Sequence, residues 1–209
     1  PHTFLAGDAG LELLAFASGT DTSITYLPRA RTMWCGPRWV PVDGPHPFRA
    51  EGEAGPLDRP EPGDRPANVI AVDAIGPETK PGSEIRRAGA AAGSAKAGLN
   101  HVWLQAGAAG APLHCHALEE ELFYVLEGAG RLRLGDDEHP LNAGDVVARP
   151  PGSAVAHGLV AGEAGMTYLA YGTRESGDLC YYPRSNKLAF RGLNLIGRLE
   201  ALDYWDGED

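Results

Sequence analysis

Two histidines separated by one residue, with a glutamate close behind, are the part of this sequence best suited to chemistry. His114 and His116 flank Cys115, and Glu121 follows after four residues. On an extended strand, residues i and i+2 face the same side about 6.5–7 Å apart, so two imidazoles can converge on one ion. A turn of this length can bring the Glu121 carboxylate back beside them. Imidazole and carboxylate ligands with an open position suit iron, manganese, nickel, cobalt, copper or zinc.

The polar residues next to the histidine pair are expected to have other roles. Glu119 and Glu120 are expected in a solvated turn, and Glu120 is the alternative ligand if the register slips by one residue. Cys115 should face away from the histidine pair as a small apolar side chain, because successive side chains on a strand alternate between faces.

These residues resemble the first motif of the cupin superfamily. That motif runs glycine, His-x-His, three or four residues, glutamate, six residues, glycine. Here Gly107 or Gly110 precedes His114-Cys115-His116, and Gly128 closes the motif with six residues between it and Glu121. Under this resemblance, the spacing to Gly128 selects Glu121 over its two acidic neighbours.

A second motif of the same superfamily follows in order. It runs glycine, five residues, Pro-x-Gly, a short gap and then histidine, and here it reads Gly144, Pro150-Pro151-Gly152 and His157. The gap before His157 is four residues, where the shorter family pattern has two, and the asparagine often found after the histidine is absent. The resemblance covers residues 97–172 and makes His157 the fourth ligand.

The resemblance implies an all-β double-stranded β-helix, the jelly-roll barrel, with extra N-terminal strands. It also implies a divalent transition metal (iron, manganese, nickel or zinc) held by His114, His116, Glu121 and His157. The pattern of short apolar or alternating runs separated by glycine and proline turns independently favours a sandwich or barrel. The runs expected to be strands are 68–73, 99–105, 122–126, 131–134, 145–149, 157–161, 166–171 and 179–182.

An internal repeat organises the rest of the chain. Residues 1–31 align without gaps on 156–186 at an offset of 155, with ten identities that include His2 on His157. We therefore interpret residues 1–31 as the C-terminal remnant of a first cupin copy in a truncated two-cupin protein. Residues 32–66 are rich in proline and glycine and are predicted to be a linker. Residues 67–209 are predicted to be the intact cupin domain.

Composition limits the partners. The chain has 209 residues, 43 % hydrophobic residues and a formal net charge of −10, which makes nucleic acid or an anionic membrane surface a poor partner. Three scattered cysteines and no visible signal peptide favour a reducing, cytoplasmic location. The strands of residues 1–31 would leave unpaired edges, so we expect a homodimer.

Several strand residues are candidates for contacting a small-molecule substrate, although alternation alone does not show which face they occupy. They are Trp103, Gln105, Phe123, Arg133 and Arg149, with His101 and Tyr171 as further candidates. The favoured function is a metal-dependent enzyme, a dioxygenase-like oxidoreductase ahead of an isomerase or lyase. The alternatives are a non-catalytic metal- or ligand-binding cupin and a purely structural remnant.

Overall fold

The computed structural model describes residues 3–17, 24–35, 38–40, 46–56, 58, 61 and 63–208. The chain divides into two compact units, Pro1–Asp64 and Arg65–Asp209. Within the described residues, no helix is long and apolar enough to cross a membrane.

The first unit holds a small antiparallel sheet and one helix. The sheet has the order β1-β2-β3, with β1 at Ile24–Leu27, β2 at Thr32–Cys35 and β3 at Arg38–Val40, and the helix α1 spans Pro47–Glu53. Two strands and a helix therefore lie within the predicted linker 32–66, and the assignment of this segment as a linker stays a prediction. Proline is favourable at the first helical position, where its missing N–H costs nothing, and an Arg49–Glu53 ion pair at 2.7 Å supports the single helix that follows.

The sequence repeat is accompanied by a repeat of local structure. β1 and β2 correspond at the same offset to β12 (Leu179–Tyr182) and β13 (Lys187–Phe190). The strand registers correspond too, since Ile24 pairs with Cys35 and Leu179 pairs with Phe190. The residues before β2 and β13, Arg31 and Asn186, share a left-handed φ of 51° and 48°. The hairpin is thus duplicated, while the assignment of residues 1–31 to the remnant of a first cupin copy stays a prediction; His2 lies outside the described residues.

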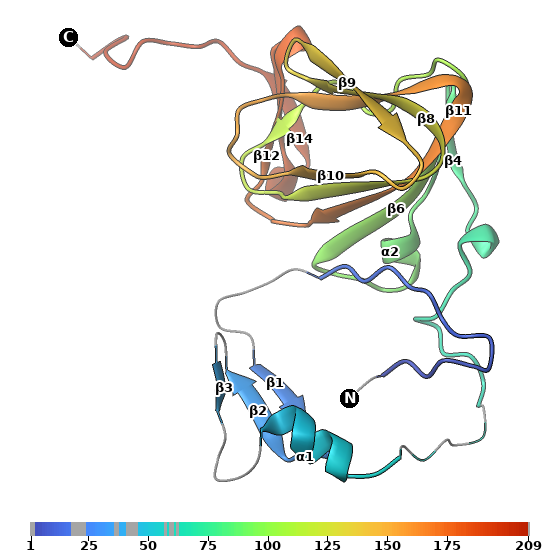
Figure 1. Cartoon of the computed structure of the whole chain (residues 1–209). Coiled ribbons are helices and arrows are strands. Elements are labelled where there is room, and N and C mark those ends of the chain that lie inside the picture. The colour runs from blue at the N-terminus through green and yellow to red at the C-terminus, as the bar shows by residue number, and fades with distance from the viewer. Residues whose placement is uncertain are drawn as a thin grey trace. The chain divides into compact units, whose positions relative to one another are not determined.

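The second unit is built from two antiparallel sheets that curve around one core (Figure 1). The larger has the order β10-β8-β11-β6-β5-β4, with β9 also paired to β8, and the smaller has the order β14-β13-β12-β7. Their remaining strands are β4 (Glu78–Lys80), β5 (Ser83–Arg86), β6 (Ala97–Leu104), β7 (Cys115–His116), β8 (Glu121–Leu134), β9 (Asp137–Asn142), β10 (Val146–Arg149), β11 (His157–Thr173) and β14 (Leu195–Arg198). Short helical segments are η1 (Val72–Ala74), α2 (Ala88–Ala91), η2 (Pro183–Ser185) and η3 (Arg191–Leu193). The predicted all-β jelly-roll fold is confirmed.

The core fixes which strand residues face inward. Val102 and Leu104 of β6 pack with Val125 of β8 and with Leu159 and Met166 of β11 in one buried cluster. Because side chains alternate along a strand, the inward phase of β6 belongs to the even-numbered residues. The same phase places Asn100 on the inner face.

The strand expected at 68–73 is absent. This segment is a turn followed by the 3₁₀ helix Val72–Ala74, and Val69 and Ile70 remain exposed. A β-branched apolar run becomes a strand only where a neighbouring strand accepts its hydrogen bonds, and among the described residues none pairs with it.

Gly128 should be far less replaceable than Gly144, another motif glycine with a left-handed backbone. Both have positive φ, 77° and 93°. A Cβ on Gly128 would collide with the backbone of Gly165 and Met166, whereas a Cβ on Gly144 has no atom within 4 Å. Gly144→Ala should cost about 1–2 kcal/mol of unfolding free energy from backbone strain alone. Gly128→Ala should cost more than about 4 kcal/mol. Urea denaturation of both variants measures this, and equal costs would contradict the close strand approach.

Candidate metal centre

Four side chains converge where the two sheets meet. His116 lies on β7 of the smaller sheet, while Glu121 and His157 are the first residues of β8 and β11 of the larger sheet. His114 is joined to His157 by a pair of backbone hydrogen bonds of 3.1 and 2.8 Å. The barrel therefore places Glu121 and His157 at strand starts and His116 at the end of β7, and it ties His114 to His157 through the main chain.

One oxygen atom of Glu121 faces all three imidazoles. Glu121 Oε2 lies 3.6 Å from His114 Nε2, 3.5 Å from His116 Nε2 and 2.7 Å from His157 Nε2. Ligand atoms bound at about 2.1 Å to a common ion are about 3.0–3.4 Å apart. The three distances from Glu121 Oε2 are therefore close to those expected between atoms that bind the same ion.

The polar atoms at the centre fit a metal ion. Glu121 Oε2 and His157 Nε2 are both buried and neither has a hydrogen-bond partner; their 2.7 Å approach does not have the geometry of a hydrogen bond. Buried polar atoms rarely go unpaired, since each costs about 1–3 kcal/mol. A divalent cation bound by the three imidazole Nε2 atoms and Glu121 Oε2 would satisfy them.

Partners outside the centre set which histidine nitrogen faces it. His116 Nδ1 lies 2.6 Å from Asp178 Oδ2, and His114 Nδ1 lies 2.7 Å from the Pro112 carbonyl oxygen. Each acceptor holds the proton on Nδ1, so that Nε2 keeps its lone pair for a metal. Asp178 is itself fixed, because it is 1 % exposed and its Oδ1 accepts hydrogen bonds from the backbone N–H groups of Leu118 and Glu119.

Charge at the centre also suits metal binding. Burial alone would raise the pKa of Glu121, but the facing imidazoles of His114 and His157 lower it overall, so the carboxyl group is ionised. Burial lowers the pKa of His157, which keeps that imidazole neutral. For His114, burial acts in the lowering direction, but contacts with Glu121 and the Pro112 carbonyl raise the pKa overall.

Strand β12 supports the centre with alternate residues. Asp178 precedes the strand, Cys180 pairs across the sheet with His116, and the Tyr182 ring stacks on His114 with centroids 5.8 Å apart. Burial raises the pKa of the Cys180 thiol to about 11, so this thiol is protonated at neutral pH. Sequence reasoning missed these residues, and the only local signal was their spacing of two.

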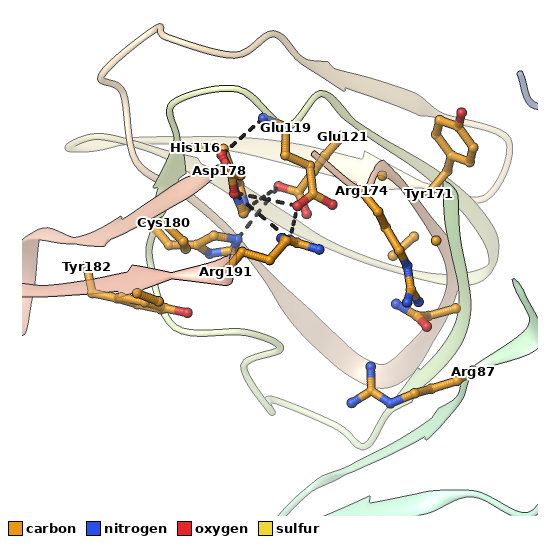
Figure 2. A pocket seen from close by; sticks show the side chains of 16 residues that line it. Arg87, His116, Glu119, Glu121, Tyr171, Arg174, Asp178, Cys180, Tyr182 and Arg191 are labelled. Carbon is orange, nitrogen blue, oxygen red and sulfur yellow. Dashed lines mark hydrogen bonds and ion pairs between the residues drawn. The ribbon is translucent and has the colours of Figure 1, made fainter. Parts of the chain in front are cut away.

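A cavity of about 420 Å³ opens beside the centre (Figure 2). His114, His116 and Glu121 form one wall, and the remaining lining comes from β6, β11, β12, β13 and the segments beside them, with both polar and small residues. The prediction that Glu119 lies in a solvated turn is wrong: it is buried and ion-paired with Arg191, because the turn folds inward over β7. Glu120 is exposed, and its side chain lines no part of the cavity.

The residues predicted to contact substrate differ in how close they lie to the metal centre and its cavity. Phe123 is buried with its ring 5.7 Å from that of His157, so it lies beside the centre. Trp103 and Gln105 are exposed and outside the cavity, because Val102 and Leu104 take the inward phase of β6. Their role as substrate contacts stays a prediction that this cavity does not support, and His101 shares the outward phase. Tyr171 lines the cavity.

The two arginines on barrel strands are held by other groups. Arg149 lies beside Cys115 and His157, but its guanidinium donates to Ser153 Oγ and the Val155 carbonyl at 3.1 and 3.0 Å. Arg133 faces Glu138 at 3.4 Å on the far side of the barrel wall and does not line the cavity beside the metal centre.

Comparison with known proteins agrees with this architecture. The family model for Cupin_2, a cupin domain, matches residues 100–170. A solved structure from Silicibacter pomeroyi, described as a sugar phosphate isomerase from a cupin superfamily, is 30% identical to this chain. It matches with a TM-score of 0.54, over 57% of this chain and 84% of that one. A solved structure from Acidithiobacillus ferrooxidans is 24% identical with a TM-score of 0.58, over 66% of this chain and 97% of that one, and shows the fold alone.

A jelly-roll barrel with a candidate metal centre where its two sheets meet defines a cupin-type domain. The chain belongs to the cupin superfamily. No match was found among curated proteins.

Proposed function

We propose that the barrel unit is a divalent-metal-dependent isomerase acting on a small hydroxylated carbonyl compound. The observation that carries this proposal is the convergence of three imidazoles and one carboxylate oxygen beside a cavity of about 420 Å³. The Silicibacter pomeroyi relative, described as a sugar phosphate isomerase, favours isomerisation over the other reactions considered.

The chain's own residues supply the remaining functions. When bound, the metal would polarise a substrate carbonyl or hydroxyl oxygen as a Lewis acid. Burial raises the pKa of Tyr182, so its hydroxyl stays protonated and can donate a hydrogen bond to a substrate oxygen in the cavity. Among the carboxylates lining the cavity, Asp178 is committed to His116 and Glu121 to the imidazoles. Glu119 is the candidate proton acceptor, with Arg191 holding it in place.

Dioxygenase chemistry is the second candidate. A set of imidazole and carboxylate ligands with open positions also suits Fe(II), the metal of many oxygenases. The two candidates differ in a direct way, since isomerisation consumes no dioxygen. The homodimer and the cytoplasmic location remain predictions.

One experiment distinguishes these functions. The protein is stripped with a chelator, reloaded separately with Mn(II), Fe(II), Ni(II) or Zn(II), and incubated in D₂O with a panel of aldoses, ketoses and their phosphates. NMR follows deuterium incorporation beside the carbonyl group while an electrode follows dioxygen. We expect metal-dependent deuterium incorporation with no dioxygen uptake. Metal-dependent dioxygen uptake would establish the second candidate instead, and metal binding without any conversion would identify a non-catalytic binding protein.

A further inference from the structure

The cavity continues away from the metal centre over a floor of small residues. On this floor Asn100 pairs across the sheet with Ala170, and Gly98 pairs with Gly172. Cross-strand partners face the same side of a sheet, so β6 and β11 present these four residues together. Arg174 follows two residues after Gly172 and extends the same face. The floor therefore leads from the ligands to a guanidinium group.

Arg174 differs from the other two arginines that line the cavity. Arg87 donates to both oxygens of Glu78 at 2.5 and 2.7 Å, and Arg191 is paired with Glu119. Among the described residues, the Arg174 guanidinium has no carboxylate partner and no hydrogen bond. It packs over Gly98, where a Cβ atom would lie 3.1 Å from Arg174 Nε. A half-buried cation thus borders the cavity without a neutralising charge (Figure 2).

Asn100 adds a second unsatisfied group to this end of the cavity. Its Oδ1 atom is buried and has no hydrogen-bond partner, and the residue lines the cavity between the ligands and Arg174. A buried acceptor without a partner is suited to receive a hydrogen bond from a ligand group such as a hydroxyl. An unpaired guanidinium calls for an anion, and its planar fork matches phosphate oxygens well.

We propose that Arg174 and Asn100 form a substrate subsite in which Arg174 binds a phosphate monoester and Asn100 accepts a hydrogen bond from a neighbouring hydroxyl group. The subsite deepens the proposed function and rests on it, because its ligand is the substrate of that reaction. Arg87 also lines the cavity (Figure 2), but its guanidinium is neutralised by Glu78, so Arg174 is the group that binds the anion, and the second negative charge of a phosphate monoester favours it over a carboxylate.

Calorimetric titration of the chelator-treated protein tests the subsite separately from the metal. The probes are glycerol 3-phosphate, glycerol, D-glycerate and inorganic phosphate. We expect glycerol 3-phosphate to bind at least about tenfold more tightly than glycerol, which has no charged group, and more tightly than D-glycerate, whose carboxylate carries less negative charge than a phosphate monoester. Binding of D-glycerate as tight as that of glycerol 3-phosphate would overturn the assignment to phosphate.

Three variants locate the binding. Arg174→Gln should weaken glycerol 3-phosphate binding about 10–100-fold, whereas Arg184→Gln, an equal loss of charge at an exposed position outside the cavity, should leave it unchanged. Asn100→Ala should weaken glycerol 3-phosphate binding but spare inorganic phosphate, which offers no neighbouring hydroxyl. Equal losses in Arg174→Gln and Arg184→Gln would overturn the subsite. Metal content and melting temperature, measured on each variant, separate this result from a loss of the metal centre or of the fold.

Discussion

Glu121→Gln should lose divalent metal almost completely while Glu120→Gln keeps it. Glu121 Oε2 faces all three imidazoles. Of the four proposed ligands, three are neutral imidazoles, so Glu121 supplies the negative charge that balances the cation. An amide is a neutral and weaker ligand, so the fall in affinity should exceed the roughly 10–100-fold that is typical when an outer partner is removed. Competition with a chromophoric chelator measures the affinity.

Glu120→Gln is the matched control because it makes the same chemical change one residue away, on an exposed side chain. It also tests the alternative ligand register. Loss of metal in Glu120→Gln, with retention in Glu121→Gln, would reverse the assignment. Circular dichroism of both variants shows whether the barrel is intact.

Asp178→Asn should lower metal affinity about 10–100-fold although Asp178 lies outside the proposed ligand set. The backbone N–H groups of Leu118 and Glu119 require an oxygen at the position of Asp178 Oδ1. The asparagine amide group must therefore face His116 Nδ1 and donate to it. That donation moves the imidazole proton to Nε2, which blocks the atom needed for the metal.

The test of this tautomer change needs a readout other than stability. The spectrum of the Co(II)-loaded protein should change in Asp178→Asn, and ¹⁵N NMR of His116 should show protonated Nε2 in the metal-free variant. Asp136→Asn, in an exposed turn, should change neither. A variant that binds metal normally with its Nδ1 proton in place would show that Asp178 only stabilises the fold.

The sequence predicted best those features that depend on residues close together in the chain. The turn at Gly144 and the alternating apolar runs predicted the barrel strands, and the motif spacing predicted residues that the fold brings together. Two strands were longer than predicted: runs 122–126 and 131–134 form the single strand β8, and runs 157–161 and 166–171 form β11. Glycines that seemed to end these runs instead lie in close strand approaches, where a side chain would not fit.

Residues supporting the site could not be predicted because their relation to the ligands is non-local. Asp178 lies 62 positions from His116, and no pattern in either segment indicates the other. The duplicated hairpin makes the same point: the residues aligned with Asp178, Cys180 and Tyr182 are Ser23, Thr25 and Leu27. The first copy keeps the hairpin registers without the side chains that contact the histidines.

The sequence by itself determined the all-β class and the candidate ligands His114, His116, Glu121 and His157, because residue type and spacing along a strand act locally. Only the tertiary structure decided which face of β6 points inward, that Asp178 orients His116, and that Arg174 is left without a counter-charge at the cavity. These features depend on strand register and sheet closure. They are set by packing between segments distant in the chain, where burial and hydrogen bonding rather than local preference select the partner.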